Sequence, residues 1–198
     1  MAQTAQLRVI DQAENEAQRV FALQREAYLA HPFPSLEERK ENLRKLDRVL
    51  SENANAIAEA INADFGHRAV EETLMAEVFG TVDGIRHAIK HVAKWMKPQR
   101  RAVAITFAGG SNTVIPQPKG VVGIVSPWNY PLFLTAGPLT SILAAGNRAM
   151  IKMASSSQNL ARLLDEKFSA VFPEDTVKIL VGVRAQDGGD LADVPEHA

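Results

Sequence analysis

A short run with aromatic and amide side chains holds the residue types best suited to chemistry. The run is Pro127-Trp128-Asn129-Tyr130-Pro131, and it directly follows an apolar stretch typical of a buried strand. At the carboxyl end of a parallel strand, Asn129 could aim its side-chain amide at a developing oxyanion while the flanking prolines fix the backbone. The ordinary alternative is a turn whose tryptophan packs on the core, and the residues alone favour it.

A lysine at the end of a second apolar run is another candidate ligand contact. Lys152 is followed by three serines, residues 155–157, at the start of a predicted helix. A lysine beside a helix N-terminus suits a phosphate or a ribose, but a surface lysine before an N-cap serine fits the pattern equally well. The nearby Gly120-Val121-Val122-Gly123 lacks the G-x-G-x-x-G spacing of dinucleotide-binding folds. Any phosphate must therefore bind through groups other than a glycine-rich loop of that type.

Two further motifs are interpreted as structural. His87 and His91 have the spacing of paired metal ligands on a helix, but no third ligand lies near them in the sequence. We therefore predict a solvated helix flank and no metal site. Gly146-Asn147 follows a predicted helix, where a residue that tolerates positive φ is needed, and is expected to form a turn.

Composition excludes several classes of function for these 198 residues. The sequence has no cysteine, so it can form no disulfide, thiolate metal site or cysteine nucleophile. Its 22 basic and 23 acidic residues are spread along the chain, which leaves no basic face for nucleic acid. No apolar run approaches the roughly 18 residues of a membrane span, and the polar N-terminus is unlike a signal peptide. We expect a cytoplasmic protein with no membrane or nucleic-acid partner.

The elements that must position these residues fall into three segments. Residues 1–100 show helical periodicity, with a capping box at Ser35 and Glu38, a break near 51–53, a helix end at Gly66 and a long helical stripe over 74–95. Residues 101–117 alternate at Val103, Ile105 and Phe107 before a glycine-rich turn, which predicts a β-hairpin.

The third segment, residues 118–198, alternates short apolar runs with helical patterns. The predicted strands lie at 121–125, 149–151 and 177–181, and the predicted helices at 132–145 and 160–172. Such alternation is typical of a parallel βαβαβ unit. The predicted fold class is α/β, with N-terminal helices, a β-hairpin and an incomplete parallel βαβαβ that forms half of a Rossmann-like dinucleotide-binding fold.

Taken together, these motifs resemble a known family. Three segments are similar in order and spacing to the N-terminal signature of the aldehyde dehydrogenase superfamily. They are Pro118-Lys119-Gly120-Val121-Val122-Gly123-Ile124-Val125-Ser126-Pro127-Trp128-Asn129-Tyr130-Pro131-Leu132, then residues 144–148, then Ile151-Lys152. Upstream, residues 31–39, 64–68, 72–73 and 95–98 resemble the coniferyl aldehyde dehydrogenase branch. The resemblance covers about residues 15–183 and identifies the chain as an N-terminal part of such an enzyme.

The resemblance implies a mechanism and a set of site residues. In this family a cysteine thiolate attacks the aldehyde, hydride passes to NAD or NADP, and a glutamate activates the water that hydrolyses the thioester. The resemblance implies that Asn129 contributes to the oxyanion hole and that Lys152 binds the adenosine ribose. The residues implied to line the cofactor cleft are Val125, Ser126, Pro127 and Trp128, and those implied to line the aldehyde tunnel are Tyr130 and Leu134. The hairpin would belong to the oligomerisation domain, so the complete enzyme is expected to be a homo-oligomer.

Departures from the family pattern shape the expected function. Ser155 stands where the family commonly has a glutamate that holds the ribose hydroxyls, and a serine is compatible with a 2′-phosphate. The nucleophilic cysteine and the glutamate base are absent from these residues, so we expect no aldehyde oxidation by the chain alone. Cofactor binding by a half-built cleft is not expected either. The alternatives are a non-catalytic partner of a full-length aldehyde dehydrogenase and an independent nucleotide-binding module.

Overall fold

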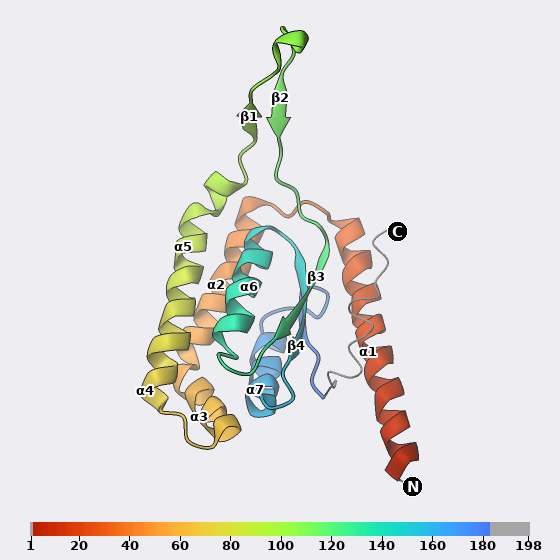
Figure 1. The fold of residues 1–198 in the computed structure, drawn as a ribbon, viewed down its shortest axis with the longest axis vertical. Helices are drawn as coiled ribbons and strands as arrows, with labels where there is room; N and C mark the ends of the chain where they lie inside the picture. Colours follow the sequence, from red (N-terminus) through yellow and green to blue (C-terminus); the bar gives the residue numbers. More distant parts are fainter. Residues whose placement is uncertain (1, 183–198) are drawn as a thin grey trace.

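Helices cover both faces of a small parallel sheet (Figure 1). The computed structural model describes residues 2–182, with side chains from residue 16 onward, so the polar, glycine-rich segment after Gly182 lies outside the described residues. Helix α1 (Ala2–Ala30) lies against one face of the sheet, whereas α6 (Phe133–Ala144) and α7 (Gln158–Ser169) cover the other. Helices α2 (Leu36–Glu52), α3 (Ala54–Phe65) and α5 (Gly80–Trp95) pack outside α6 and α7 as a further layer.

The N-terminal helices begin and end where the sequence predicts. At the start of α2 the Glu38 amide donates to Ser35 Oγ at 3.3 Å, and the Ser35 amide donates to Glu38 Oε2 at 2.7 Å. This confirms the capping box. Asn53 separates α2 from α3, and Gly66 ends α3 with a φ of 85°. Only glycine adopts that conformation without strain.

The helical stripe over 74–95 is not one regular helix. After a single turn, α4 (Val70–Thr73), the chain forms a π-helical segment η1 (Leu74–Phe79) before α5 continues it. The wider π turn accommodates one extra residue, so side chains on either side of it change face. Glu77 is fully buried here, whereas Met75 and Phe79 are exposed. Apolar periodicity alone could not reveal this change, because it reports only the average repeat.

Three parallel strands form the sheet in the order β3-β4-β5, which confirms the predicted βαβαβ unit. They are β3 (Val121–Ser126), β4 (Arg148–Met153) and β5 (Val177–Ile179). In β4, Ile151 joins the large core under α6 and α7, whereas Met150 joins a small cluster with Val20 of α1. The apolar character of both faces follows from this double covering.

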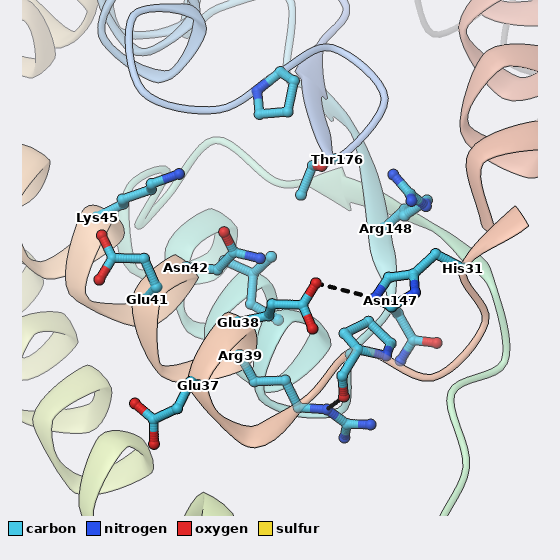
Figure 2. A pocket seen from close by; sticks show the side chains of 14 residues that line it. His31, Glu37, Glu38, Arg39, Glu41, Asn42, Lys45, Asn147, Arg148 and Thr176 are labelled. Atoms are coloured by element: carbon cyan, nitrogen blue, oxygen red, sulfur yellow. Dashed lines mark hydrogen bonds and ion pairs between the residues drawn. The ribbon is translucent and has the colours of Figure 1, made fainter.

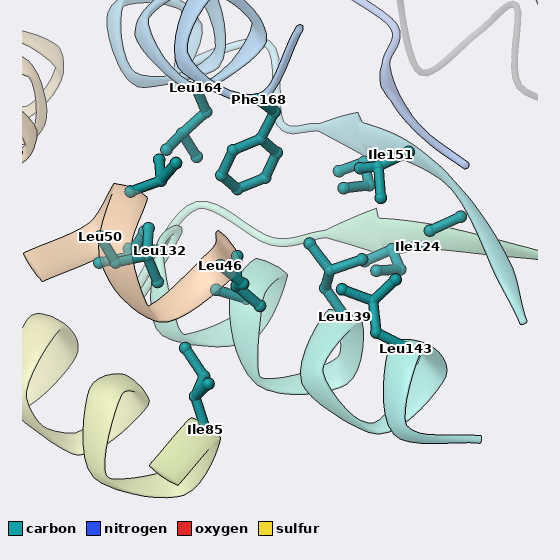
Figure 3. Packing of buried hydrophobic residues seen from close by; sticks show 14 of the residues in the cluster. Leu46, Leu50, Ile85, Ile124, Leu132, Leu139, Leu143, Ile151, Leu164 and Phe168 are labelled. Carbon is teal, nitrogen blue, oxygen red and sulfur yellow. The ribbon is translucent and has the colours of Figure 1, made fainter. Parts of the chain in front are cut away.

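The main core fills the space between the sheet and the outer helices. Figure 3 shows Leu46 and Leu50 of α2, Ile85 of α5, Leu139 and Leu143 of α6, and Leu164 and Phe168 of α7 converging on Ile124 and Ile151 of the sheet. Because these side chains come from both the helical segment and the βαβαβ unit, residues 1–100 and the sheet share one core. These two segments therefore pack as one body.

The predicted hairpin is present, but its first strand lies earlier than the apolar alternation suggests. Antiparallel strands β1 (Gln99–Arg101) and β2 (Asn112–Val114) pair with Gln99 opposite Val114. The alternating residues Val103, Ile105 and Phe107 were expected to form the first strand, but the segment Ile105–Phe107 is a 3₁₀ turn at the tip. This part of the prediction is wrong, because alternation of apolar residues also arises in an exposed loop. The hairpin projects from the body of the molecule (Figure 1).

Helices α6 and α7 receive their N-terminal caps from the helical segment. Neither Leu132 nor Ser157, at the two N-cap positions, caps its helix with its own side chain. Glu77 Oε2 instead accepts from the amides of Leu132 at 2.8 Å and Phe133 at 3.1 Å. Asp64 Oδ1 and Oδ2 accept from the amides of residues 159 and 160 at 2.9 and 3.0 Å. Carboxylates at these ends also complement the helix dipoles.

A positively charged side chain, that of Arg39, binds the C-terminus of α6. Arg39, which is buried, donates from Nη1 to the carbonyl of Ala144 at 3.3 Å and from Nε to that of Pro34 at 3.0 Å. Gly146 follows with a φ of 82°, and a Cβ there would lie 2.8 Å from the Arg39 guanidinium carbon. The predicted turn at Gly146-Asn147 is confirmed, and Asn147 fastens it by accepting from the Lys119 and Gly120 amides.

Helix α1 is attached to the sheet by a buried glutamine. Gln24, the one polar member of an otherwise apolar face, donates from Nε2 to the carbonyls of Ala149 and Glu174, both at 3.0 Å. Arg19 adds an ion pair to Glu174 at 2.7 Å. Although α1 has 29 residues, no helix within residues 2–182 has both the length and the apolar character to cross a membrane.

We predict that Asp64→Ala lowers the free energy of unfolding of the chain by about 1 kcal/mol, because α7 then loses its N-terminal acceptors. Glu59→Ala is the matched control: Glu59 is an exposed carboxylate on the same helix, and its loss should change stability by less than about 0.5 kcal/mol. Urea denaturation followed by circular dichroism measures both values. Equal losses in the two variants would contradict the capping role.

Candidate functional site

The candidate site lies at the carboxyl edge of the parallel sheet, where the turns that follow β3 and β4 meet. Val125 pairs with Lys152 and Ser126 with Met153, so the two strands end side by side. The turn 127–131 leaves β3 and the serine-containing turn 154–157 leaves β4 at this edge. Open α/β sheets bind ligands at this edge. The sheet therefore brings together the two groups of residues that the sequence analysis singled out.

Hydrogen bonds inside the turn after β3 give it a defined shape. Thr135 Oγ1 donates to the Pro131 carbonyl at 2.6 Å, and it also lies 2.8 Å from Ser126 Oγ. Ser126 is buried, and its hydroxyl bonds the carbonyl of Pro131 at 3.3 Å. Its side chain is therefore engaged within the turn rather than exposed at this edge of the sheet. Val125 and Pro127, in contrast, are exposed at this edge.

The tryptophan of this turn does not pack on the core. Trp128 is 62% exposed, and its ring lies 6.3 Å from that of Phe65 at the end of α3. The expectation of a core-packed tryptophan is therefore wrong. A large aromatic side chain left at a sheet edge instead offers a surface for a ligand or another part of a protein.

Asn129 is exposed, and its side-chain amide has no hydrogen-bond partner among the side chains that the structure describes. Its main-chain carbonyl, by contrast, is bound by Arg68. Tyr130 is exposed next to it, and Leu134 is half-buried in the first turn of α6, where its amide donates to the Tyr130 carbonyl at 2.9 Å. The predicted oxyanion donor and the two predicted tunnel residues thus share one turn and one helix start.

An ion pair beneath this turn was not predicted. Arg68 Nη1 donates to the Asn129 carbonyl at 2.9 Å and lies 3.1 Å from Glu77 Oε1. Through its other carboxylate oxygen, Glu77 caps α6. A sequence signal did exist: Thr73, Glu77 and Thr81 recur every four residues beside the apolar stripe, and all three are buried. Such a row indicates a buried polar network rather than a solvated face.

Electrostatics and stacking define the surroundings of this pair. Burial raises the pKa of Glu77, while the hydrogen bonds from the two amides and the charge of Arg68 oppose the rise. The Arg68 guanidinium carbon lies 4.8 Å from the ring centre of Tyr130 and 5.0 Å from that of Phe65. These cation–π contacts hold the guanidinium between two aromatic rings. Glu72 reaches the same group from the solvent side, at 3.1 Å from Nη2.

Lys152 is buried, so the alternative of a surface lysine is wrong. The residue is only 4% exposed, and its ammonium has no hydrogen-bond or ion-pair partner among the side chains of residues 16–182. The protein covers its hydrocarbon stem, which leaves the ammonium at this edge of the sheet, unpaired among the described residues. The arrangement therefore suits a ligand that brings hydrogen-bond acceptors to this edge.

The helix after Lys152 is less suited to phosphate than the sequence suggested. The N-terminus of α7 already holds the carboxylate of Asp64, and that of α6 holds Glu77. A phosphate at either end would meet a carboxylate in place of free amides. Ser155 is exposed in the turn between Lys152 and α7. Of the two ligands considered for Lys152, a ribose fits this arrangement better than a phosphate.

A cavity of about 470 Å³ lies at the opposite, amino edge of the sheet (Figure 2). Several of its polar side chains already have partners: His31 lies 3.0 Å from Glu38, Arg148 pairs with Asp175, and Arg39 bonds the Pro34 carbonyl. The cavity lies away from the residues that the sequence analysis singled out as candidate ligand contacts. We therefore assign it no functional role.

The histidine pair lies on the flank of α5. The rings of His87 and His91 stack with their centres 4.0 Å apart, and Trp95 continues the row. Among the described residues no group of three or more His, Asp or Glu side chains is arranged to hold a metal ion.

Comparison with known proteins places the chain in a family. The model of the aldehyde dehydrogenase family matches residues 2–198. A Pseudomonas aeruginosa protein named "Probable coniferyl aldehyde dehydrogenase" is 47% identical over 182 residues, which are 92% of this chain and 38% of the relative. The chain thus spans well under half the length of this curated relative.

Solved structures share the fold. Staphylococcus aureus AldH in its substrate-bound state matches with a TM-score of 0.79 at 25% identity, covering 84% of this chain and 36% of that one. A mutant of Pseudomonas syringae AldA, an indole-3-acetaldehyde dehydrogenase in complex with NAD+ and IAA, matches with a TM-score of 0.73 at 22% identity, covering 86% and 34%. Since the family model spans nearly the whole sequence and one relative is 47% identical, the chain belongs to the aldehyde dehydrogenase family.

Proposed function

We propose that this chain supplies the oxyanion donor and the adenosine-binding edge of an NAD(P)-dependent enzyme that oxidises an aromatic aldehyde, such as coniferyl aldehyde, to its acid. The observation that carries the proposal is Asn129, whose free side-chain amide lies on a rigid turn at the carboxyl end of β3. The nucleophile would lie outside these 198 residues, since the chain has no cysteine, and by the resemblance the general base would lie there too.

The chemistry assigned to Asn129 is electrostatic. When a nucleophile attacks an aldehyde, the carbonyl oxygen gains negative charge, and a fixed donor beside it stabilises that charge more than the neutral carbonyl. An amide donor needs no proton transfer to do this. Its value depends on orientation, and the turn is held by Arg68 and Glu77 through main-chain atoms rather than through the Asn129 side chain. The side chain therefore remains free for the substrate.

The residues present fit the adenosine side of a nicotinamide cofactor. Lys152 would donate to the ribose hydroxyls, and Val125, Pro127 and Trp128 would line the cleft, with Ser126 contributing only its main chain. When bound, NAD or NADP accepts the hydride that leaves the aldehyde carbon. Because the N-termini of α6 and α7 are already capped by carboxylates, we assign the pyrophosphate to neither of them.

Ser155 bears on the choice between NAD and NADP. It is exposed in the turn that follows β4, where family members commonly carry a glutamate. A carboxylate would repel the 2′-phosphate of NADP, whereas a hydroxyl can donate a hydrogen bond to it. We infer that the complete enzyme accepts NADP alongside NAD.

Exposed aromatic side chains support an aromatic substrate. Trp128 and Tyr130 lie on either side of Asn129, and Phe133 is exposed at the start of α6. Tyr130 and Leu134 would form part of the wall of the aldehyde tunnel, with the exposed Phe133 beside them, where flat rings can stack on a flat substrate. The P. aeruginosa relative is named a probable coniferyl aldehyde dehydrogenase.

The hairpin carries the residues that we assign to contacts between copies in a homo-oligomer. They are the exposed Ile105, Phe107 and Val114.

We expect a chimera of this chain with the C-terminal part of the P. aeruginosa relative to oxidise coniferyl aldehyde, measured as aldehyde-dependent NADH or NADPH absorbance. Asn129→Ala in the chimera should lower kcat by about 100-fold to 1000-fold, with cofactor affinity within a few-fold. The chain alone, which has no thiol, should show no turnover. Full kcat in the Asn129→Ala chimera would mean that this residue only braces the turn.

Lys152→Ala in the same chimera should act mainly on the cofactor. Removing a charged hydrogen-bond donor from a ribose should raise the KM for NAD by about 10-fold, with a smaller change in kcat. Lys119→Ala is the matched control, since Lys119 is exposed near the amino edge of the sheet. An unchanged KM for NAD, or an equal rise in both variants, would remove Lys152 from the cofactor site.

Ser155→Glu tests the 2′-oxygen contact. The added carboxylate should lower the ratio of NADP to NAD efficiency (kcat/KM) by about 10-fold, because it repels a 2′-phosphate and binds ribose hydroxyls. Ser156→Glu places the same charge one residue later and should change the ratio less. If the ratio holds in Ser155→Glu, Ser155 does not face the ribose.

A further inference from the structure

The turn that carries Asn129 is held from below at three main-chain atoms. Arg68 binds the Asn129 carbonyl at 2.9 Å, and Glu77 binds the amides of Leu132 and Phe133 at 2.8 and 3.1 Å. One contact lies within the turn and two lie directly after it, and they come from two side chains that also pair with each other at 3.1 Å. One buried unit therefore sets where the turn lies relative to the helical layer.

Apolar contacts also hold the turn: Leu132 at its end is buried in the main core, and the Trp128 ring lies 6.3 Å from that of Phe65. The prolines at 127 and 131 fix their own φ angles but do not place the turn relative to the rest of the protein. The bonds among Ser126, Pro131 and Thr135 shape the turn from within. Without Arg68 and Glu77, the turn would keep its local shape and these apolar contacts but lose the hydrogen bonds that fix its main-chain atoms against the helices.

The pair is a costly way to obtain stability alone. Glu77 is fully buried, and the Arg68 side chain is 5% exposed. Two charges removed from water lose much of their hydration, and buried pairs are often no more stabilising than apolar side chains of the same size. The two charges also approach without hydrogen-bond alignment at Glu77 Oε1. Apolar side chains could not form the hydrogen bonds to the Asn129 carbonyl and to the amides of Leu132 and Phe133.

The π-helical segment contributes to this arrangement. Glu77 lies in η1, where the wider turn departs from the regular α-helical repeat. Its own carbonyl accepts from Thr81 Oγ1 at 2.6 Å, which anchors the backbone behind the carboxylate. Irregular turns of this kind are frequent at functional sites.

We infer that Arg68 and Glu77 are positioning residues that aim the Asn129 side chain at the substrate oxygen. The inference rests on the proposed function, because it assigns the pair an effect on a transition state that Asn129 must stabilise. A small misplacement of such a donor is sufficient to reduce turnover strongly. The pair acts through the main chain of the turn and touches neither aldehyde nor cofactor.

A double-mutant cycle in the chimera separates positioning from general stability. Glu77→Gln should lower kcat by about 10-fold to 100-fold while the KM for NAD stays within about 3-fold. In an Asn129→Ala background the same change should have little further effect, because the donor it positions is gone. Glu72→Gln is the matched control: it removes a carboxylate from the same guanidinium on the solvent side and should leave kcat within about 2-fold.

Two kinetic outcomes would overturn the inference. One is an equal loss of kcat from Glu77→Gln with and without Asn129, which indicates a role independent of that donor. The other is a change in Glu72→Gln as large as that in Glu77→Gln. If Glu77→Gln does not fold, Arg68→Lys replaces it, since lysine keeps the charge beside Glu77 but loses the planar group that also reaches the Asn129 carbonyl.

Amide hydrogen exchange tests the pair without any activity. In Glu77→Gln, the amides of Leu132 and Phe133 should exchange about 10-fold faster or more, while those of β4 and α7 stay unchanged; Glu72→Gln should show neither effect. A uniform increase across the protein, or none in the turn, would overturn the inference. If the chimera is inactive but the turn alone loosens, the proposed function fails while the mechanical role of the pair remains.

Discussion

Both crossover helices of the parallel sheet begin with main-chain N–H groups that their own sequences do not cap. The carboxylates of Glu77 and Asp64 bind these groups from the helical segment, and Arg39 binds the far end of α6. Each bond joins residues distant in the sequence and places a charge where the helix dipole favours it. Together with the shared core, these contacts fix the position of the sheet edge against the helices.

This mode of capping also affects ligand binding. In many dinucleotide-binding folds a helix N-terminus after the first strand holds the phosphates. Here the corresponding positions are occupied by the protein's own anions. The carboxyl edge is left with an amide, a hydroxyl, aromatic rings and the ammonium of Lys152, which is unpaired among the residues that the structure describes. Such groups suit carbonyl oxygens, ribose hydroxyls and flat rings, so the local chemistry agrees with the family to which the chain belongs.

Local sequence signals predicted the helices and strands well, but they predicted poorly which side chains are buried. The capping box at Ser35, the end of α3 at Gly66 and the three parallel strands each depend on neighbouring residues and were predicted. The exposure of Trp128, the burial of Lys152 and the Arg68–Glu77 pair depend on residues brought together only by the fold. Alternation misplaced the hairpin, because an apolar loop and an edge strand share the same pattern. The site's position was therefore predictable, but its internal contacts were not.

The direction of these caps has a bearing on how the protein is made. Leu132 lies 55 residues after Glu77, and Asn159 lies 95 residues after Asp64. A ribosome that adds about 5 to 20 residues per second exposes each carboxylate several seconds before the helix it will cap. The helical segment can therefore be present as a template when α6 and α7 emerge, and an uncapped helix start need not wait in solution for its partner. Each capping carboxylate thus precedes in the sequence the helix whose N-terminus it binds.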